Sequence, residues 1–204
     1  MNKKLQGLLL SCGLLASPVY ADDAFDLEVS ANIGMVTEYI WRGWNLNDDL
    51  SAQGGFDLSY GGFYAGTWGG TDKALGTEID IYLGYGGTIG DKFTYDVGIV
   101  QYRYPGADTK VKETHVTFGY DFLSLTYHDG EDDYNYVELN ASFDINEKMS
   151  VDLHYGREDA GNWNYNDYQV TFNYQIDDSY RVFIAAADKE DHDSHVYAGL
   201  VAEF

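Results

Sequence analysis

The chain has 204 residues, with 34 Asp and Glu against 12 Lys and Arg, which gives a formal net charge of −22. A surface for phosphate backbones or anionic headgroups needs the opposite sign, so nucleic-acid binding is excluded. After residue 20 the longest uncharged stretch, Leu58–Thr71, is short and rich in glycine, which excludes a helical membrane bundle. Only strands could then cross a membrane.

The first 21 residues have the features of a secretory signal peptide. Two early lysines precede the apolar stretch Leu5–Ala16, and Val19–Ala21 offers a cleavage site. We expect cleavage to leave residues 22–204 as one domain with a charge of 10 − 34 = −24 and no cysteine, since Cys12 is the only one. A lipoprotein cleavage site at Cys12 is less favoured, because apolar residues follow it where a polar tether is expected.

Apolar and polar residues alternate almost throughout the mature chain. In the first segment, apolar side chains from Leu27 to Trp41 occupy odd positions, and mostly polar or small ones lie between them. This period of two is typical of strands, and no helical period competes with it. We predict twelve strands, an even number as in bacterial barrels, near residues 27–42, 50–60, 63–68, 77–85, 93–104, 113–119, 122–128, 134–145, 150–156, 166–175, 180–187 and 195–204.

The predicted connections are of two kinds. Even connections are mostly tight: Gly61-Gly62 suits a two-residue primed turn, and Gly119–Phe122 is a second short reversal. Odd connections are longer and acidic, and they comprise residues 43–49, 69–76, 105–112, 129–133, 157–165 and 188–194. Short turns at one end and longer loops at the other are typical of outer-membrane barrels, with the short turns and both termini on the periplasmic side.

A soluble antiparallel sandwich would also alternate, but two features favour the membrane barrel. Aromatic residues gather at predicted strand ends, where girdles meet the membrane interfaces; they are Tyr39, Trp41, Tyr60, Phe63, Tyr85, Phe93, Tyr120, Phe143 and Tyr174. The chain also ends on a strand whose last residue is aromatic. We predict that Tyr197, Gly199 and Phe204 form the signal read by the outer-membrane assembly machinery, and that outer-membrane lipid and lipopolysaccharide surround the barrel.

Residues 31–106 resemble the TorF-type porin family of small Gram-negative outer-membrane proteins. The resemblance lies in the combination of Thr37–Tyr39, Arg42-Gly43, Gln53–Asp57, Gly62–Trp68, Glu78–Tyr82, Tyr95–Gly98 and Tyr104–Gly106. The sequence departs from the family after Gly43, where it has Trp44-Asn45-Leu46 in place of a serine-containing polar run. The resemblance implies a porin, and the family offers neither an established solute nor a catalytic site to carry over.

Strand parity predicts a strongly anionic lumen. The candidate pore-lining residues, taken from the inward parity of each strand, are Glu28, Glu38, Arg42, Asp57, Trp68, Glu78, Asp80, Asp96, Glu113, Glu138, Asp152 and Arg181. Asp167, Glu203 and four histidines (His115, His128, His154, His195) share this parity. Twelve strands allow either a narrow pore or a lumen blocked by bulky groups such as Tyr64, Trp68 and Tyr82. In the second case the polar groups only hydrate and hydrogen-bond a plugged interior.

Other kinds of site are less favoured. The acidic runs 129–133 and 188–195 lack calcium-loop spacing, and clustered carboxylates on exposed loops are usually solvated. Predicted pairing puts His115 opposite Thr126 and Thr117 opposite Ser124, so His115 and Ser124 are only diagonal neighbours, pointing inward away from lipid esters. We therefore expect no enzyme, metal or cofactor.

The sequence thus predicts an all-β, transmembrane, up-and-down antiparallel barrel exported through the periplasm to the Gram-negative outer membrane. As a porin-like channel it would pass small polar solutes by passive diffusion and favour cations. Glu38 and Arg42, on one inward row of the first strand, are expected to pair at the extracellular mouth. The alternative is a non-conducting structural or adhesive barrel whose loops are the working surface.

Overall fold

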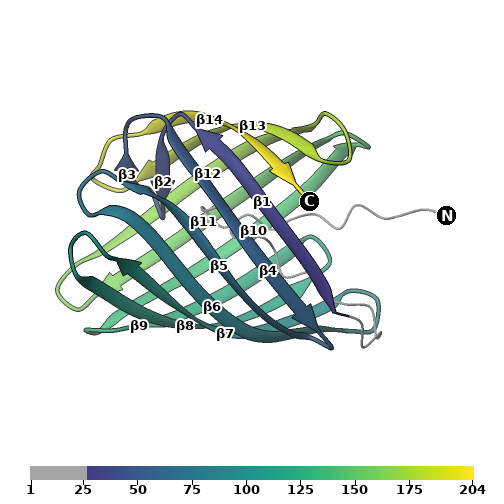
Figure 1. Cartoon of the computed structure of the whole chain (residues 1–204), viewed down its shortest axis with the longest axis horizontal. Coiled ribbons are helices and arrows are strands. Elements are labelled where there is room, and N and C mark those ends of the chain that lie inside the picture. Colours follow the sequence, from purple (N-terminus) through teal and green to yellow (C-terminus); the bar gives the residue numbers. More distant parts are fainter. Residues whose placement is uncertain (1–26) are drawn as a thin grey trace.

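The computed structural model describes residues 27–204, which form a closed barrel of twelve antiparallel strands and a separate two-stranded hairpin (Figure 1). The predicted signal peptide lies outside the described residues. The strands are β1 (Glu28–Val36), β2 (Tyr39–Trp41), β3 (Trp44–Asn47), β4 (Ser51–Tyr60), β5 (Phe63–Asp72), β6 (Gly76–Ile89), β7 (Phe93–Tyr104), β8 (Thr109–Tyr120), β9 (Leu123–Gly130), β10 (Tyr134–Asn146), β11 (Met149–Ala160), β12 (Asn164–Gln175), β13 (Tyr180–Lys189) and β14 (His195–Glu203).

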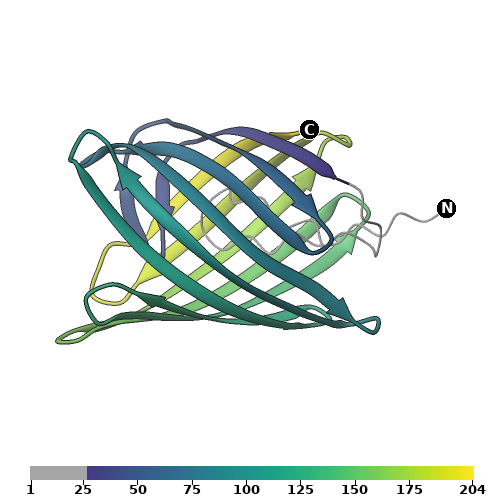
Figure 2. The same cartoon turned by 60° about the horizontal axis from the view of Figure 1, so that its bottom comes forward.

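Each barrel strand pairs with its neighbours in chain order, and β1 closes the sheet by pairing with both β4 and β14. The strands run obliquely around the barrel, as both views show (Figures 1 and 2). The last residue takes part in closure, because Phe204 and Ala31 exchange two backbone hydrogen bonds of 2.9 and 3.1 Å. Closure leaves the barrel without an exposed sheet edge.

Burial alternates along the strands in the way that the sequence predicts. Along β6, Glu78, Asp80 and Tyr82 are buried, whereas Ile79, Ile81 and Leu83 are exposed. Large apolar side chains therefore cover the outside and polar ones fill the inside, the reverse of a soluble protein. The closed barrel rules out the predicted alternative of a sandwich. Within residues 27–204 no helix is long and apolar enough to span a membrane.

An aromatic girdle surrounds the end of the barrel that carries the connections 61–62, 90–92, 121–122, 147–148 and 176–179, here called the turn end. Its outward rings meet in pairs across neighbouring strands. The centroids of Phe63 and Tyr85 are 4.8 Å apart, and those of Phe122 and Phe143 are 5.1 Å apart. The prediction that Tyr39 and Trp41 belong to such a girdle is wrong, because both lie on β2 and pack inside the barrel, Tyr39 with 4% of its surface exposed.

The connections at the opposite end, called the loop end, are mostly shorter than the sequence predicts. Its connections 73–75, 105–108, 131–133, 161–163 and 190–194 are nearly as short as the turns, because the strands continue beyond their predicted limits. Only the connection 37–50 is long, and it holds the hairpin β2–β3. The predicted first strand, 27–42, is therefore wrong beyond Val36.

The predicted register of β8 and β9 is also wrong. The turn occupies Asp121 and Phe122, so His115 pairs with His128 and Ser124 pairs with Gly119. Asp121 has φ 57°, a conformation that a short acidic side chain tolerates in a tight turn. The shift moves His115 still farther along the sheet from Ser124.

A lysine on the outer face of β6 should destabilise the barrel according to its depth. Ile81, near the strand centre, and Ile89, at the turn end, are both exposed. We expect Ile81→Lys to lower the free energy of unfolding in lipid vesicles by about 2–4 kcal/mol, and the matched control Ile89→Lys by about 0–1 kcal/mol. Equal losses in urea titrations would show that β6 does not cross a bilayer at this depth.

Candidate functional site

The hairpin β2–β3 lies inside the barrel near the loop end (Figures 1 and 2). Tyr39, Ile40 and Arg42 are 4%, 2% and 5% exposed. Arg42 and Gly43 form the tip, with φ values of 50° and 72°, which suit a two-residue primed turn. A non-glycine residue in this region costs roughly 1–2 kcal/mol, so the side chain of Arg42 must be held by compensating contacts.

The guanidinium of Arg42 occupies a socket on the wall formed by β8, β9 and β10. Its Nη1 and Nη2 donate to the two carboxylate oxygens of Glu113, both at 2.8 Å, and Nη1 also donates to the Tyr134 hydroxyl at 2.9 Å. The guanidinium carbon lies 4.1 Å from the ring centroid of Tyr136 and 4.4 Å from that of Trp41. Two parallel hydrogen bonds and flanking ring faces are the arrangement that a planar guanidinium satisfies best.

Behind this socket a row of carboxylates and imidazoles crosses five consecutive strands, here called the carboxylate–imidazole belt: Glu113, His128, Glu138, His154 and Asp167. Successive members lie 2.8, 3.2, 3.7 and 2.9 Å apart. Gly156 makes room at the far end, because a Cβ there would come within 1.9 Å of the Tyr136 hydroxyl and 2.4 Å of an Asp167 oxygen. The two imidazoles lie between the buried acids, where a ring N–H can donate to a carboxylate, as buried carboxylates require.

A second cation holds the hairpin tip. Lys189 on β13 is 1% exposed, and its Nζ donates to the backbone carbonyl of Arg42 at 3.0 Å and to Glu158 at 2.5 Å. The same ammonium lies 4.5 Å from the ring centroid of Trp44, whose indole nitrogen donates to Glu158 at 2.9 Å. The tip is therefore fixed to β11 and β13 by contacts that do not involve the Arg42 side chain.

The base of the hairpin contacts the other side of the barrel. Tyr39 donates a hydrogen bond of 3.0 Å to Glu78, and its ring lies 5.7 Å from that of Trp68. Ile40 packs where β13 and β14 present Ala185, Ala187 and Tyr197. The hairpin therefore crosses the lumen and constricts it.

At the mouth beside the hairpin, Lys73 donates to the carboxylate of Asp48, and both side chains are exposed. This hydrogen bond lowers the pKa of Asp48 and raises that of Lys73. Both groups are accessible to water and salt, so their pair contributes little to stability.

The acids on the β4–β7 side of the lumen have no strong cation beside them in the part of the chain that the structure describes. Asp57 accepts from Tyr82, Glu78 from Tyr39 and Tyr104, and Asp96 from Tyr64 and His115. Asp80 is 3% exposed, and its Oδ1 has no hydrogen-bond partner. The fixed positive charges thus neutralise one side of the lumen only.

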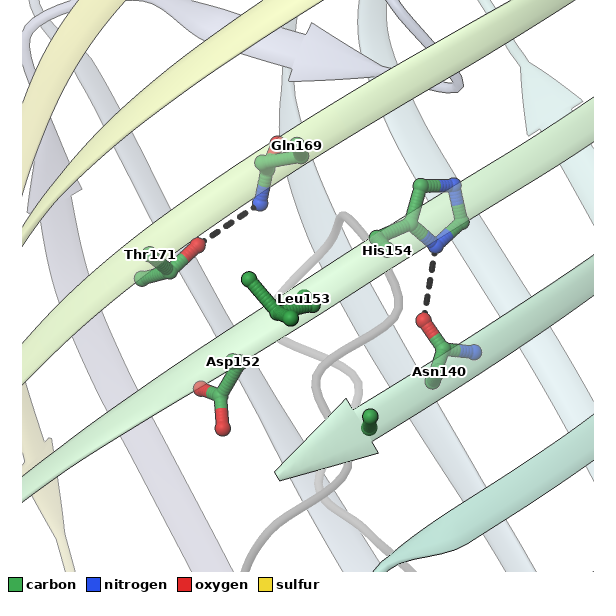
Figure 3. Close-up of a pocket in the computed structure, with 7 residues that line it drawn as sticks. Asn140, Asp152, Leu153, His154, Gln169 and Thr171 are labelled. Carbon is green, nitrogen blue, oxygen red and sulfur yellow. Dashed lines mark hydrogen bonds between the residues drawn. The ribbon is translucent and has the colours of Figure 1, made fainter. Parts of the chain in front are cut away.

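A small cavity of about 10 Å³ lies in the wall at β10, β11 and β12, and Figure 3 shows its lining. Gln169 donates to Thr171 at 3.0 Å, and His154 Nδ1 lies 2.7 Å from Asn140 Oδ1. Five of the seven lining residues are polar, but the space has room for only about one water molecule. It is too small for a solute.

The remaining predicted site residues lie in different parts of the lumen. Asp152 accepts from Ser142 and Asn173, and Arg181 lies between Asn173 and Glu203, at 2.9 and 3.6 Å. Glu28 is exposed where β1 begins. The predicted pair of Glu38 with Arg42 is wrong: because the hairpin turns inward, Arg42 reaches Glu113.

Glu38 instead binds the base of the hairpin. It accepts from Asn45 at 2.9 Å and lies 2.9 Å from His195 Nδ1.

Two residues at the centre of the site were missing from the sequence prediction. The sequence places Lys189 and Glu158 in acidic loops. In the structure both strands run on: Lys189 is the next inward position after Ala185 and Ala187 on β13, and Glu158 lies on the same inward face as Asp152 and His154 on β11. The alternation therefore carried the signal, and the high loop-like charge around each residue concealed it. Tyr134 and Tyr136 lie in a predicted strand and share the inward parity of Glu138, but they were not among the predicted site residues.

Of the predicted insertion-signal residues, Tyr197 and Gly199 lie on β14 and Phe204 directly follows it. Tyr197 points inward and donates to Gln169 at 2.8 Å, Gly199 is covered by the Phe183 ring, and Phe204 is 70% exposed. In residues 27–204 no group of three His, Cys, Asp or Glu side chains has the geometry to hold a metal ion.

The fold and lumen define a twelve-stranded barrel of the porin type with an inward hairpin. The chain belongs to the family described as "Bacterial protein of unknown function (Gcw_chp)", whose model matches residues 20–202. No curated protein matches the chain in sequence. The family's description assigns no activity, so function must be argued from the site.

Solved porins share the fold. A KdgM porin superposes with a TM-score of 0.70 over 86% of this chain and 99% of its own, at 8% identity. A structure of the KdgM porin in complex with disordered oligogalacturonate gives 0.68, again at 8% identity over 86% of this chain and 98% of that one. The NanC porin gives 0.60 at 10% identity, over 86% of this chain and 98% of that one.

Adding a methyl group at Gly43 should disturb hairpin docking. A Cβ there would lie 2.7 Å from Lys189 Cβ and 2.9 Å from Asp167 Cβ, whereas a Cβ at Gly76, which also has positive φ, meets nothing within 4 Å. We expect Gly76→Ala to cost only backbone strain, about 1–2 kcal/mol, and Gly43→Ala to cost more and to alter the fluorescence of Trp41 and Trp44. Equal losses of stability with unchanged fluorescence would contradict the docked hairpin.

Proposed function

We propose that the protein is a narrow, cation-favouring outer-membrane channel for the passive diffusion of small polar solutes, with the hairpin β2–β3 as its constriction. The uneven distribution of charge in the lumen is the observation that supports this proposal. Arg42 and Lys189 pair with Glu113 and Glu158, while Asp57, Glu78, Asp80 and Asp96 have hydroxyl or imidazole partners or none. A solute cation passing the hairpin along β4–β7 would therefore meet carboxyl groups that no fixed cation pairs with.

The charge of the lumen argues for a different kind of solute from the one named for a porin of similar shape. The charged residues buried in the described part of the chain are eight acids (Asp72, Glu78, Asp80, Asp96, Glu113, Glu138, Glu158, Asp167) and three bases (Arg42, Arg181, Lys189). The KdgM structure with oligogalacturonate shows that this barrel shape can accompany an acidic sugar ligand. A lumen with this excess of carboxylates would repel such an anion, so we propose cationic or neutral polar solutes here.

Removing carboxylates that have no cation partner should reduce selectivity. We expect the wild-type channel to favour cations at low salt, and less so near 1 M, where the Debye length falls to about 3 Å. The triple variant Asp57→Asn/Glu78→Gln/Asp80→Asn should move the reversal potential in a salt gradient toward zero. Single-channel recording on the refolded protein measures both effects.

The matched control removes three charges from a loop. Glu131, Asp132 and Asp133 are exposed at the loop end, so Glu131→Gln/Asp132→Asn/Asp133→Asn should shift the reversal potential less. Equal shifts in the two variants would place the selectivity at the mouth. Anion preference would overturn the cation proposal, and absence of conductance in the wild type would overturn the channel.

The rival function is a non-conducting structural or adhesive barrel, and one observation favours it. The hairpin is held on both sides of the lumen, by Tyr39 at Glu78 and by Arg42 at Glu113. If this arrangement never opens, the polar interior only hydrates and supports the plug. Conductance separates the two functions directly.

We place the protein in the outer membrane with the loop end outside, after removal of residues 1–21. The mature chain would then lack cysteine, so single introduced thiols can report the orientation. Glu131→Cys should react with an impermeant thiol reagent on intact cells, whereas Asp91→Cys, exposed at the turn end, should react only after permeabilisation. The reverse labelling pattern would mean that the barrel has the opposite orientation. If neither cysteine reacts in permeabilised cells, the two positions are not exposed as the structure has them.

Four further sequence predictions enter the proposal. The outer-membrane assembly machinery would recognise the end of the chain through Tyr197, Gly199 and Phe204. The TorF-type resemblance would define a subgroup of the family to which this chain belongs. No catalytic activity is proposed, because His115 is engaged with Asp96 while Ser124 pairs with Gly119. Outer-membrane lipid and lipopolysaccharide would contact the exposed apolar belt.

A further inference from the structure

We propose that the wall socket of Glu113, Tyr134 and Tyr136 is a binding site for the guanidinium group of a solute, and that Arg42 is its resident, exchangeable occupant. The proposal deepens the channel function and rests on it only for the route by which a solute reaches the socket. It assigns the solute class: small cations with a planar guanidinium or amidinium group.

The socket residues belong to the barrel wall and not to the hairpin. Glu113 is 3% exposed on β8, and its Oε1 lies 2.8 Å from His128 Nδ1 and 3.3 Å from the Tyr102 hydroxyl. These contacts orient the carboxylate so that both oxygens face the guanidinium. Tyr136, on β10, is fully buried and presents its ring face 4.1 Å from the guanidinium carbon. Strand-borne groups of this kind are preorganised for a ligand.

The occupant, by contrast, comes from a connection. Arg42 lies at the tip of β2–β3, outside the sheet that closes the barrel, and its backbone has φ 50°. Asparagine or glycine would satisfy this turn position with less strain, so the turn itself does not call for arginine. The bidentate pair with Glu113 is what the arginine contributes.

Removal of the Arg42 side chain need not release the hairpin. Lys189 holds the carbonyl oxygen of Arg42, and Tyr39 and Trp44 hydrogen-bond to Glu78 and Glu158. A solute guanidinium can therefore replace the tethered one while the hairpin remains docked. Because a tethered group acts at a high effective concentration, a solute competes poorly in the wild type and binds readily when the tethered group is missing.

The test is calorimetric titration of refolded Arg42→Ala with methylguanidinium, at millimolar concentrations. We expect saturable binding that is at least about tenfold tighter than in the wild type. Urea has the same planar shape without charge, and methylammonium has the charge without the fork, so both should bind at least about tenfold more weakly. Adding Glu113→Gln should abolish the binding. Arg157→Ala, which removes an exposed arginine on β11, should behave as the wild type does.

Equal binding by Arg42→Ala and the wild type, equal binding of the three probes, or no effect of Glu113→Gln would overturn the site. If Arg42→Ala does not fold alone, its refolding yield, read from the heat-modifiable band, should be restored by methylguanidinium and not by urea or methylammonium; equal yields with all three would overturn it too. None of these readouts needs conductance. Binding without conductance would leave the site standing and remove the channel.

Discussion

The pairing of β1 with β14 closes the sheet into a barrel. It sends every second side chain of twelve strands into one narrow lumen, and in this chain many of those side chains are acids. Buried carboxylates need donors or cations, since an isolated buried charge is very costly. The belt from Glu113 to Asp167, the tyrosine hydroxyls and the inserted hairpin all meet this need.

The two buried ion pairs also give the hairpin a defined position. Arg42 with Glu113 and Lys189 with Glu158 are both nearly inaccessible to solvent, so desolvation offsets much of their Coulomb attraction. Their value therefore lies in specificity: a guanidinium that needs a bidentate partner fits at one place on the wall. The same two pairs leave the β4–β7 side without a fixed cation, which links the fold of one hairpin to the distribution of charge in the lumen.

The porin likeness fixes shape but not chemistry. At 8% and 10% identity, the likeness to the KdgM and NanC porins extends to the fold alone. In a barrel the outer face must be apolar and the backbone must be paired, and many sequences satisfy both conditions. The proposed function therefore rests on the inward residues, among which acids outnumber bases.

The barrel could be predicted from the order of residues alone, because strand alternation and tight turns are local properties that recur along the chain. Alternation also shows which face of a strand points inward, so Glu78, Asp80 and Glu113 were correctly predicted to face the lumen. The path of residues 37–50 could not be predicted in this way. Alternation continues from β1 into β2 as though one strand ran on, and the inward turn is settled by partners far away in the chain, Glu113 for Arg42 and Lys189 for its carbonyl, which no local pattern contains.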